Sequence, residues 1–220
     1  MRVPSSSTLG VVMAQPKVLP LILVEEGGLK AAGLSKAQTQ WTAGLGFTGQ
    51  RGKLSPLPTD SGSLGGYLFG LGAKAGRPAL LTGMAAALLE GGRYRLDGAI
   101  DDPTCAALGF RLGAYRFGRY KTQKEAPELV MPSGADAAAV TRLTDAAYLA
   151  RDLINTPAND LGPDAFDLAI RAFAARHKMK LKATVGDDLL KQNFPMIHAV
   201  GRAGPEAPRL LDMTWGRPSD

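Results

Sequence analysis

Cysteine is nearly absent from this chain, histidine is scarce, and no long apolar run occurs in its 220 residues. One thiol cannot close an internal disulfide, so nothing indicates an oxidising compartment and we expect a cytoplasmic protein. No stretch approaches the roughly eighteen apolar residues that a membrane helix requires. The longest candidate, VLPLILV at Val18–Val24, is short, contains Pro20 and lacks the flanks of a secretion signal. It therefore predicts a buried strand.

The sequence also lacks a recognisable catalytic constellation. His177 and His198 are its only histidines, and neither has cysteine or carboxylate neighbours at metal-ligand spacing. Cys105 has no activating pattern around it and is typical of a small buried side chain. Asp187 and Asp188 start a short helical pattern, where capping and the helix dipole account for them. We therefore predict no catalytic residue, no cofactor ligand and no metal ligand in this chain.

The positive charge is unevenly distributed. The net charge of +6 lies entirely in residues 1–134, which hold 15 Lys and Arg against 9 Asp and Glu, whereas residues 135–220 are balanced at 11 each. In Arg111–Lys124, RLGAYRFGRYKTQK, basic residues alternate with aromatic ones, the composition of single-strand nucleic-acid grooves. The alternative, which we favour, is a helix end followed by a solvated basic turn with its aromatics packed inward.

A glycine motif at Gly44–Gly49, GLGFTG, satisfies the G-x-G-x-x-G pattern of dinucleotide sites. Such a site needs a helix after the glycines, so that the phosphate meets its N-terminus. The sequence continues as QRGKLSPLP, which does not predict a helix. Because glycine is frequent here, with 13 in residues 44–92, we interpret the motif as a chance match.

Short apolar segments bounded by glycine dominate the first part of the chain and predict strands and tight turns, at Gly62–Gly72 and Arg77–Met84. A helix is expected after Asp102, which can cap it, and a short strand at Glu128–Pro132. Strands interleaved with helices favour an α/β architecture.

The second part begins with a helical pattern that starts near Asp136 and stops near Asn155, because Pro157 disfavours the helical conformation for Thr156. Pro163 then restarts a helix, since proline suits the first helical position. Asn155 and Asn159 have short amides that can hydrogen-bond backbone groups at a turn. We expect a structural role for this junction rather than a chemical one. Strands are predicted at Lys180–Val185 and Arg209–Trp215.

Several of these stretches together resemble the leucyl aminopeptidase (cytosol aminopeptidase) family. ARDLINTPANDLGPDAF, at Ala150–Phe166, is similar to the Asn-Thr-Pro-x-Asn signature at the junction of that family's two domains. YRFGRYKT, at Tyr115–Thr122, resembles a segment near the end of the N-terminal domain. MIHAVGRAGPEAPRLLDMTW, at Met196–Trp215, resembles the opening of the catalytic domain.

The resemblance implies a macro-domain-like mixed sheet flanked by helices in residues 1–134, a connecting helix in 135–156, and the first strand–helix units of an incomplete α/β catalytic domain in 157–220. It implies a hexameric exopeptidase that removes N-terminal residues from peptides with two divalent metals, manganese, zinc or magnesium. The family's metal ligands and catalytic arginine come after the segment matched by Arg209–Trp215. We therefore expect this chain alone to be inactive. Alternatives are a module that binds nucleic acid or an ADP-ribose-type ligand, or an oligomer-assembly domain.

Overall fold

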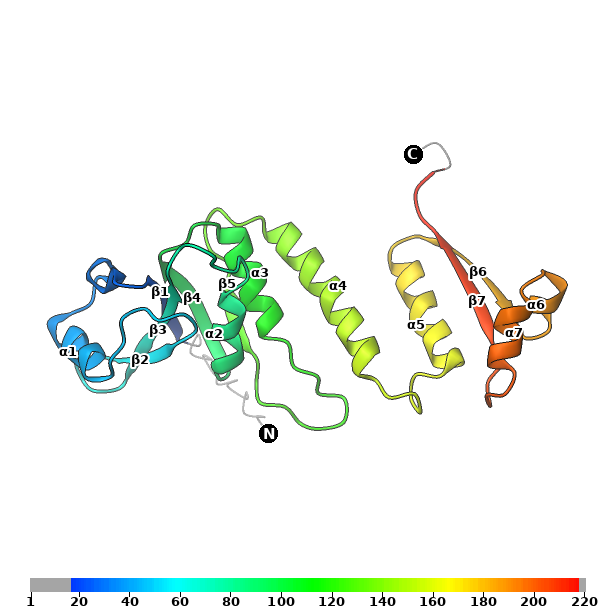
Figure 1. Cartoon of the computed structure of the whole chain (residues 1–220), viewed down its shortest axis with the longest axis horizontal. Helices are drawn as coiled ribbons and strands as arrows, with labels where there is room; N and C mark the ends of the chain where they lie inside the picture. The colour runs from blue at the N-terminus through cyan, green and yellow to red at the C-terminus, as the bar shows by residue number, and fades with distance from the viewer. Residues whose placement is uncertain (1–16, 218–220) are drawn as a thin grey trace, which may run out of the picture. The chain divides into compact units, whose positions relative to one another are not determined.

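The computed structural model describes residues 17–217, whose contacts divide the chain into two units, Met1–Leu149 and Ala150–Asp220. The first unit contains a five-stranded sheet and the second a two-stranded sheet (Figure 1). Both units combine sheets with helices, so the predicted α/β class is confirmed. Within residues 17–217, no helix is both long and apolar enough to cross a membrane.

The sheet of the first unit is mixed, in the order β2-β3-β1-β4-β5. The central strand β1 is parallel to both β3 and β4, β5 is parallel to β4, and only β2 is antiparallel to its neighbour. A parallel strand covered on both faces needs a continuous apolar run, which explains the predicted strand at Val18–Val24. The strands are β1 (Val18–Glu25), β2 (Leu54–Pro58), β3 (Leu64–Gly72), β4 (Gly92–Gly98) and β5 (Pro127–Val130).

Helices and loops cover both faces of this sheet. On one face, Leu21 and Leu23 of β1 join a core that includes Phe110 of α3, which is 0% exposed. On the other face, Val24 packs with Phe47, and the short helix η1 adds to that cluster. The helices of this unit are η1 (Gly28–Ala32), α1 (Lys36–Gly44), α2 (Thr82–Leu88), α3 (Pro103–Gly113) and the greater part of α4 (Ala137–Asn155).

Helix starts in this unit follow the sequence with one exception. Asp102 caps α3 as predicted, and Asp136 accepts a hydrogen bond from the Ala139 amide at the start of α4. The strand predicted over Arg77–Met84 is wrong, because this segment turns and enters α2 at Thr82. An alanine-rich sequence favours helix, and the glycine at position 83 lets α2 approach α3, since a Cβ there would lie 2.8 Å from a backbone oxygen of α3.

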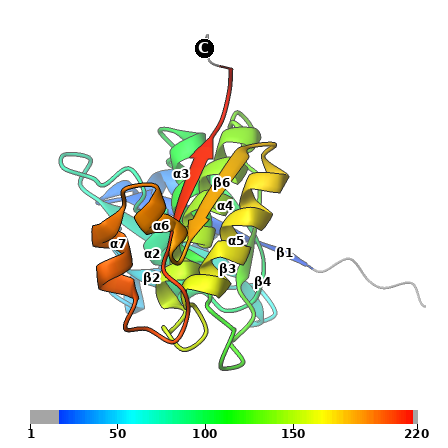
Figure 2. The same cartoon turned by 90° about the vertical axis from the view of Figure 1, so that its right-hand side faces the viewer.

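The second unit pairs β6 and β7 antiparallel, with Val185 opposite Arg209. Figure 2 looks onto this unit and shows the two strands side by side. Both strands were predicted. The elements are the last turn and a half of α4, then α5 (Pro163–Arg176), β6 (Lys180–Val185), α6 (Asp188–Lys191), α7 (Pro195–Gly201) and β7 (Arg209–Thr214).

Asp187 occupies the N-cap position of α6 as predicted, but the expected side-chain cap is not formed. Asp187 already has helical backbone angles, φ −67° and ψ −14°, and its side chain makes no capping hydrogen bond. Its carboxylate instead lies 3.2 Å from Nε2 of His198 in α7. Asp187 therefore links α6 to α7, and His198 has a structural partner.

Candidate functional site at the domain junction

The junction begins where α4 stops. Thr156 is buried, at 9% exposure, and both its amide and its hydroxyl donate to the Asp152 carbonyl oxygen, at 3.1 and 2.6 Å. The helix ends at Asn155, one residue before Thr156, as the following Pro157 predicted. The buried threonine therefore closes the last turn with its own side chain.

Backbone hydrogen bonds hold the turn that follows. The Pro157 carbonyl oxygen accepts from the amides of Asp160 and Leu161, at 2.9 and 3.0 Å. Asn159 is exposed, and its side chain hydrogen-bonds to no other residue within 17–217. Pro163 occupies the first turn of α5, as predicted. The turn is therefore held by the Pro157 carbonyl, and the amide of Asn159 adds nothing to it.

Glu206 and Arg209 bind residues in the first turns of α5. The Glu206 carboxylate accepts a hydrogen bond from the Asp164 amide at 2.7 Å, so it satisfies one of the free N–H groups at the helix start. Arg209 of β7 pairs with the carboxylates of Asp164 and Asp167, the latter at 2.9 Å. Asp167 is 6% exposed and also forms an ion pair with Arg171 at 2.8 Å. The junction is thus tied to β7.

Opposing effects act on the pKa of Asp167. Burial raises it, but hydrogen bonds from Arg171 and Arg209 and the charges of both guanidinium groups outweigh burial and hold the pKa below its usual value. Asp167 is therefore ionised at neutral pH. Sequence reasoning missed this cluster, because Asp167 and Arg209 are 42 residues apart and no local pattern joins them.

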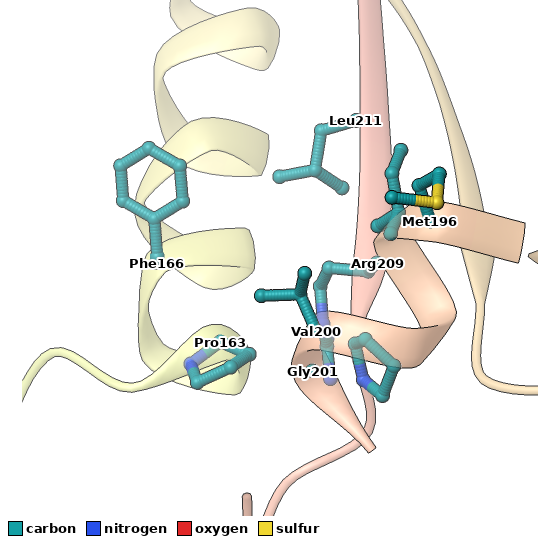
Figure 3. Close-up of a pocket in the computed structure, with 9 residues that line it drawn as sticks. Pro163, Phe166, Met196, Val200, Gly201, Arg209 and Leu211 are labelled. Atoms are coloured by element: carbon teal, nitrogen blue, oxygen red, sulfur yellow. The ribbon is translucent and has the colours of Figure 1, made fainter. Parts of the chain in front are cut away.

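An apolar groove of about 710 Å³ lies between α5, α7 and β7 (Figure 3). Phe166 extends into it from α5, Leu211 from β7, and Met196 and Val200 from α7. Met196 and Val200 are 74% and 81% exposed. The only charged lining residue is Arg209, which is already paired with two carboxylates. The groove can therefore bind apolar groups, but it contains no acid, base or nucleophile for chemistry.

A metal centre needs several His, Cys, Asp or Glu side chains close together. Residues 17–217 contain no group of three or more His, Cys, Asp or Glu side chains that could hold a metal ion. The two carboxylates beside the groove, Asp164 and Asp167, are committed to Arg209. The described residues thus do not fit a two-metal centre, and no chemical step through a metal follows from them.

The glycine motif of the first unit is a helix end. Gly44 is the last residue of α1, and Gly46 has a positive φ of 59°. Phe47 belongs to the core at 1% exposure, and the chain continues into β2 rather than into a helix. The motif therefore does not present a helix N-terminus to a phosphate.

A crevice of about 270 Å³ opens at the carboxyl ends of β1, β3 and β4, where open α/β sheets commonly bind ligands. Its guanidinium, Arg77, pairs with Glu25 at 2.6 Å and with Asp101 at 3.2 Å. The amides at the start of α3 donate to Asp102. The positive groups are therefore neutralised, which disfavours the ADP-ribose-type alternative at this place.

Cys105 lines the same crevice. A hydrogen bond with Asp102, together with burial and the Asp102 charge, raises the pKa of its thiol. Because only the thiolate is a strong nucleophile, this environment keeps the thiol unreactive. The absence of an activating pattern agrees with this chemistry, but the expected burial does not, because Cys105 is only half-buried at the crevice.

The basic segment after α3 is folded onto the first unit. Lys124 pairs with Glu90 at 2.8 Å, and Arg111 donates to the Thr141 hydroxyl at 3.0 Å. Phe117 and Tyr120 pack against each other, with ring centroids 5.8 Å apart. These contacts favour the second alternative, a solvated turn, although Tyr120 is exposed rather than packed inward as expected.

Two α/β units, one built on a five-stranded mixed sheet and the other on a two-stranded sheet, define the class as a two-unit α/β protein. Comparison with known families narrows this class. The M17 aminopeptidase N-terminal domain matches residues 19–132, and the catalytic domain of the cytosol aminopeptidase family matches residues 148–220. The chain therefore belongs to the M17, or cytosol aminopeptidase, family.

Individual relatives support the same family assignment. A protein named "Probable cytosol aminopeptidase" from Streptomyces griseus is 31% identical over a region that covers 80% of this chain and 42% of its own. The crystal structure of a cytosol aminopeptidase from Coxiella burnetii is 30% identical, with a TM-score of 0.79 over 94% of this chain and 46% of that one. A bottromycin maturation enzyme in complex with Mn shares the fold, at 24% identity and a TM-score of 0.76 over 93% of this chain and 46% of its own. This chain thus spans less than half the length of these relatives.

Proposed function

We propose that the whole protein is a metal-dependent aminopeptidase that hydrolyses N-terminal residues from peptides. The main support is that the chain matches both domains of the family in order, the N-terminal domain at residues 19–132 and the catalytic domain at residues 148–220. The fold similarity over 94% of the chain supports the same proposal. Two divalent metals would activate water and polarise the scissile carbonyl. Manganese is supported by its presence in one structural relative, and zinc by the family resemblance alone.

Within that protein, we assign residues 1–134 to a macro-like N-terminal domain, 135–156 to a connecting helix and 157–220 to the start of the catalytic domain. The division of contacts at Leu149 and the gap between the two family matches support a boundary near α4. Asn155, Thr156, Pro157 and Pro163 then form a structural junction, and Asn159 is an exposed residue of the same turn. Cytoplasmic location is supported by the names of the relatives, and assembly as a hexamer by the resemblance.

Activity on leucine p-nitroanilide tests the proposal. The complete product of the gene is expected to release p-nitroaniline with added Mn²⁺ and to lose this activity in EDTA. Since the resemblance puts the metal ligands after β7, the purified 220-residue chain is expected to show no turnover under the same conditions. Metal-independent turnover by the complete product would contradict the first statement. Turnover by the 220-residue chain would contradict the second.

A further inference from the structure

The first unit has a second pocket, of about 420 Å³, beside the edge strand β5. Its walls come from β5 and the residues next to it, from the end of α3, and from α4. Lining residues are Arg111, Ala114, Arg116, Ala126, Pro127, Glu128, Leu129, Met131 and Tyr148. The volume lies in the range of small-molecule sites.

Two arginine residues line this pocket, and neither forms an ion pair with a carboxylate of the described residues. Arg111 and Arg116 each lie more than 4 Å from every carboxylate oxygen within residues 17–217. Arg77 in the crevice of the same unit is instead paired with two carboxylates. The single acidic residue of the pocket, Glu128, is directed to Arg93 at 3.6 Å. The pocket therefore has an excess positive charge that the crevice lacks.

Hydrogen bonds hold both guanidinium groups in place, and each group retains N–H donors that these bonds do not use. Arg116 donates to the carbonyl oxygens of Gly113, Tyr115 and Ala86, at 3.1, 2.9 and 3.3 Å. Because a guanidinium has five N–H groups, these three bonds leave about two for a ligand. Arg111 uses one, in its bond to Thr141.

Aromatic contacts stiffen the wall between the two arginines. The Tyr148 hydroxyl donates to the Arg111 carbonyl oxygen, and the Tyr148 ring meets Tyr115 edge-on at 5.0 Å. Sites whose side chains are fixed before binding lose less entropy on binding. Leu129, Met131 and Ala114 also line the pocket and add apolar surface to it. The pocket thus combines fixed cationic donors with an apolar wall.

We propose that this pocket binds a small organic anion, in which a phosphate or carboxylate group pairs with Arg111 and Arg116 and an apolar body contacts Leu129 and Met131. Guanidinium groups match the geometry of both oxyanions. Such binding is independent of the peptidase reaction proposed above. It gives a role to two of the three arginines of the basic segment, Arg111 and Arg116, whose position in a pocket suits a small ligand better than a nucleic-acid strand.

Calorimetric titration of the 220-residue chain with phenyl phosphate at neutral pH and low salt tests this site. We expect saturable binding that is tighter than for inorganic phosphate and absent for phenol, because the anion and the apolar body both contribute. Benzoate in a parallel titration distinguishes a carboxylate from a phosphate ligand. Absence of saturable binding for both phenyl phosphate and benzoate, or equal binding of phenol, would overturn the proposal.

Three variants locate the binding. Arg111→Gln is expected to weaken it at least about tenfold, the effect of one lost charge-assisted hydrogen bond. Arg142→Gln is the matched control, an exposed arginine of α4 outside the pocket, and should leave it unchanged. Glu128→Gln should strengthen it about two- to threefold, because it removes the one carboxylate of the lining. Misfolding would weaken binding, so it cannot account for tighter binding by this variant. Equal weakening by Arg111→Gln and Arg142→Gln would show nonspecific attraction and reject the site.

Discussion

The two units of this chain are stabilised by different means. Among residues 17–217, nineteen of the 21 buried apolar residues belong to the first unit, where they pack on both faces of a five-stranded sheet. The second unit contributes two, Ala174 and Leu189, and its buried polar residues include Asp167 and Thr184. A two-stranded sheet alone is marginally stable in water. Ion pairs and caps therefore matter more in the second unit, and packing matters more in the first.

The largest expected effect comes from the core of the first unit. Phe110→Ala should lower the free energy of unfolding of that unit by about 3–5 kcal/mol, because it leaves a cavity at a fully buried position. Val200→Ala, at an 81% exposed position of the second unit, should change stability by less than about 0.5 kcal/mol. Urea unfolding followed by hydrogen exchange of peptides from each unit measures both. Equal effects would abolish the contrast between the units.

The next largest effect is a pH dependence of stability that is expected in the second unit. The folded pKa of Asp167 is lowered, so its contribution is fully present above the unfolded value of about 3.9 and is lost as pH falls through the folded pKa. Asp167→Asn should therefore destabilise the second unit at neutral pH, and the difference from wild type should shrink below about pH 4. Exchange rates of α5 and β7 amides between pH 3 and 7, corrected for intrinsic exchange, measure this. A difference that is constant over the range would contradict it.

The smallest effect tests the cap of α5. Glu206→Gln should destabilise the second unit by about 1 kcal/mol, because it weakens the hydrogen bond to the Asp164 amide. Asn159→Ala is the matched control at the same junction, since this exposed side chain hydrogen-bonds to no other residue in the described range. It should change stability by less than about 0.5 kcal/mol. If Asn159→Ala had the larger effect, the predicted amide role at this position would be restored.

Local patterns predicted most of the fold. The apolar run of β1, the cap at Asp102, the helix stop before Pro157 and the restart at Pro163 all follow from rules that act over a few residues. The failures share a cause. Arg77–Met84 was expected as a strand, but it enters α2 and packs against α3 through Gly83 and the glycines of α3, and Asp187 contacts a histidine 11 residues away.

The candidate sites were less predictable than the fold. The Arg209 cluster joins residues 42 and 45 positions apart, and the proposed anion pocket brings β5 next to the end of α3 and to Tyr148 of α4. The sequence marked Arg111 and Arg116 only as part of a basic segment. Tertiary packing decides which Arg and Lys side chains lack a carboxylate partner. The amino-acid composition alone therefore cannot predict it.

The reach of Glu206 to the start of α5 has a kinetic consequence. The first turn of that helix is completed by a residue 42 positions later, so this cap forms only after the intervening chain closes into a loop. Loop-closure entropy opposes that step, and its cost grows only slowly with length. Arg209 bridges to Asp167 across the same separation, so both long-range bonds share one closure. We therefore expect α5 and β7 to become protected together during refolding, in one cooperative step.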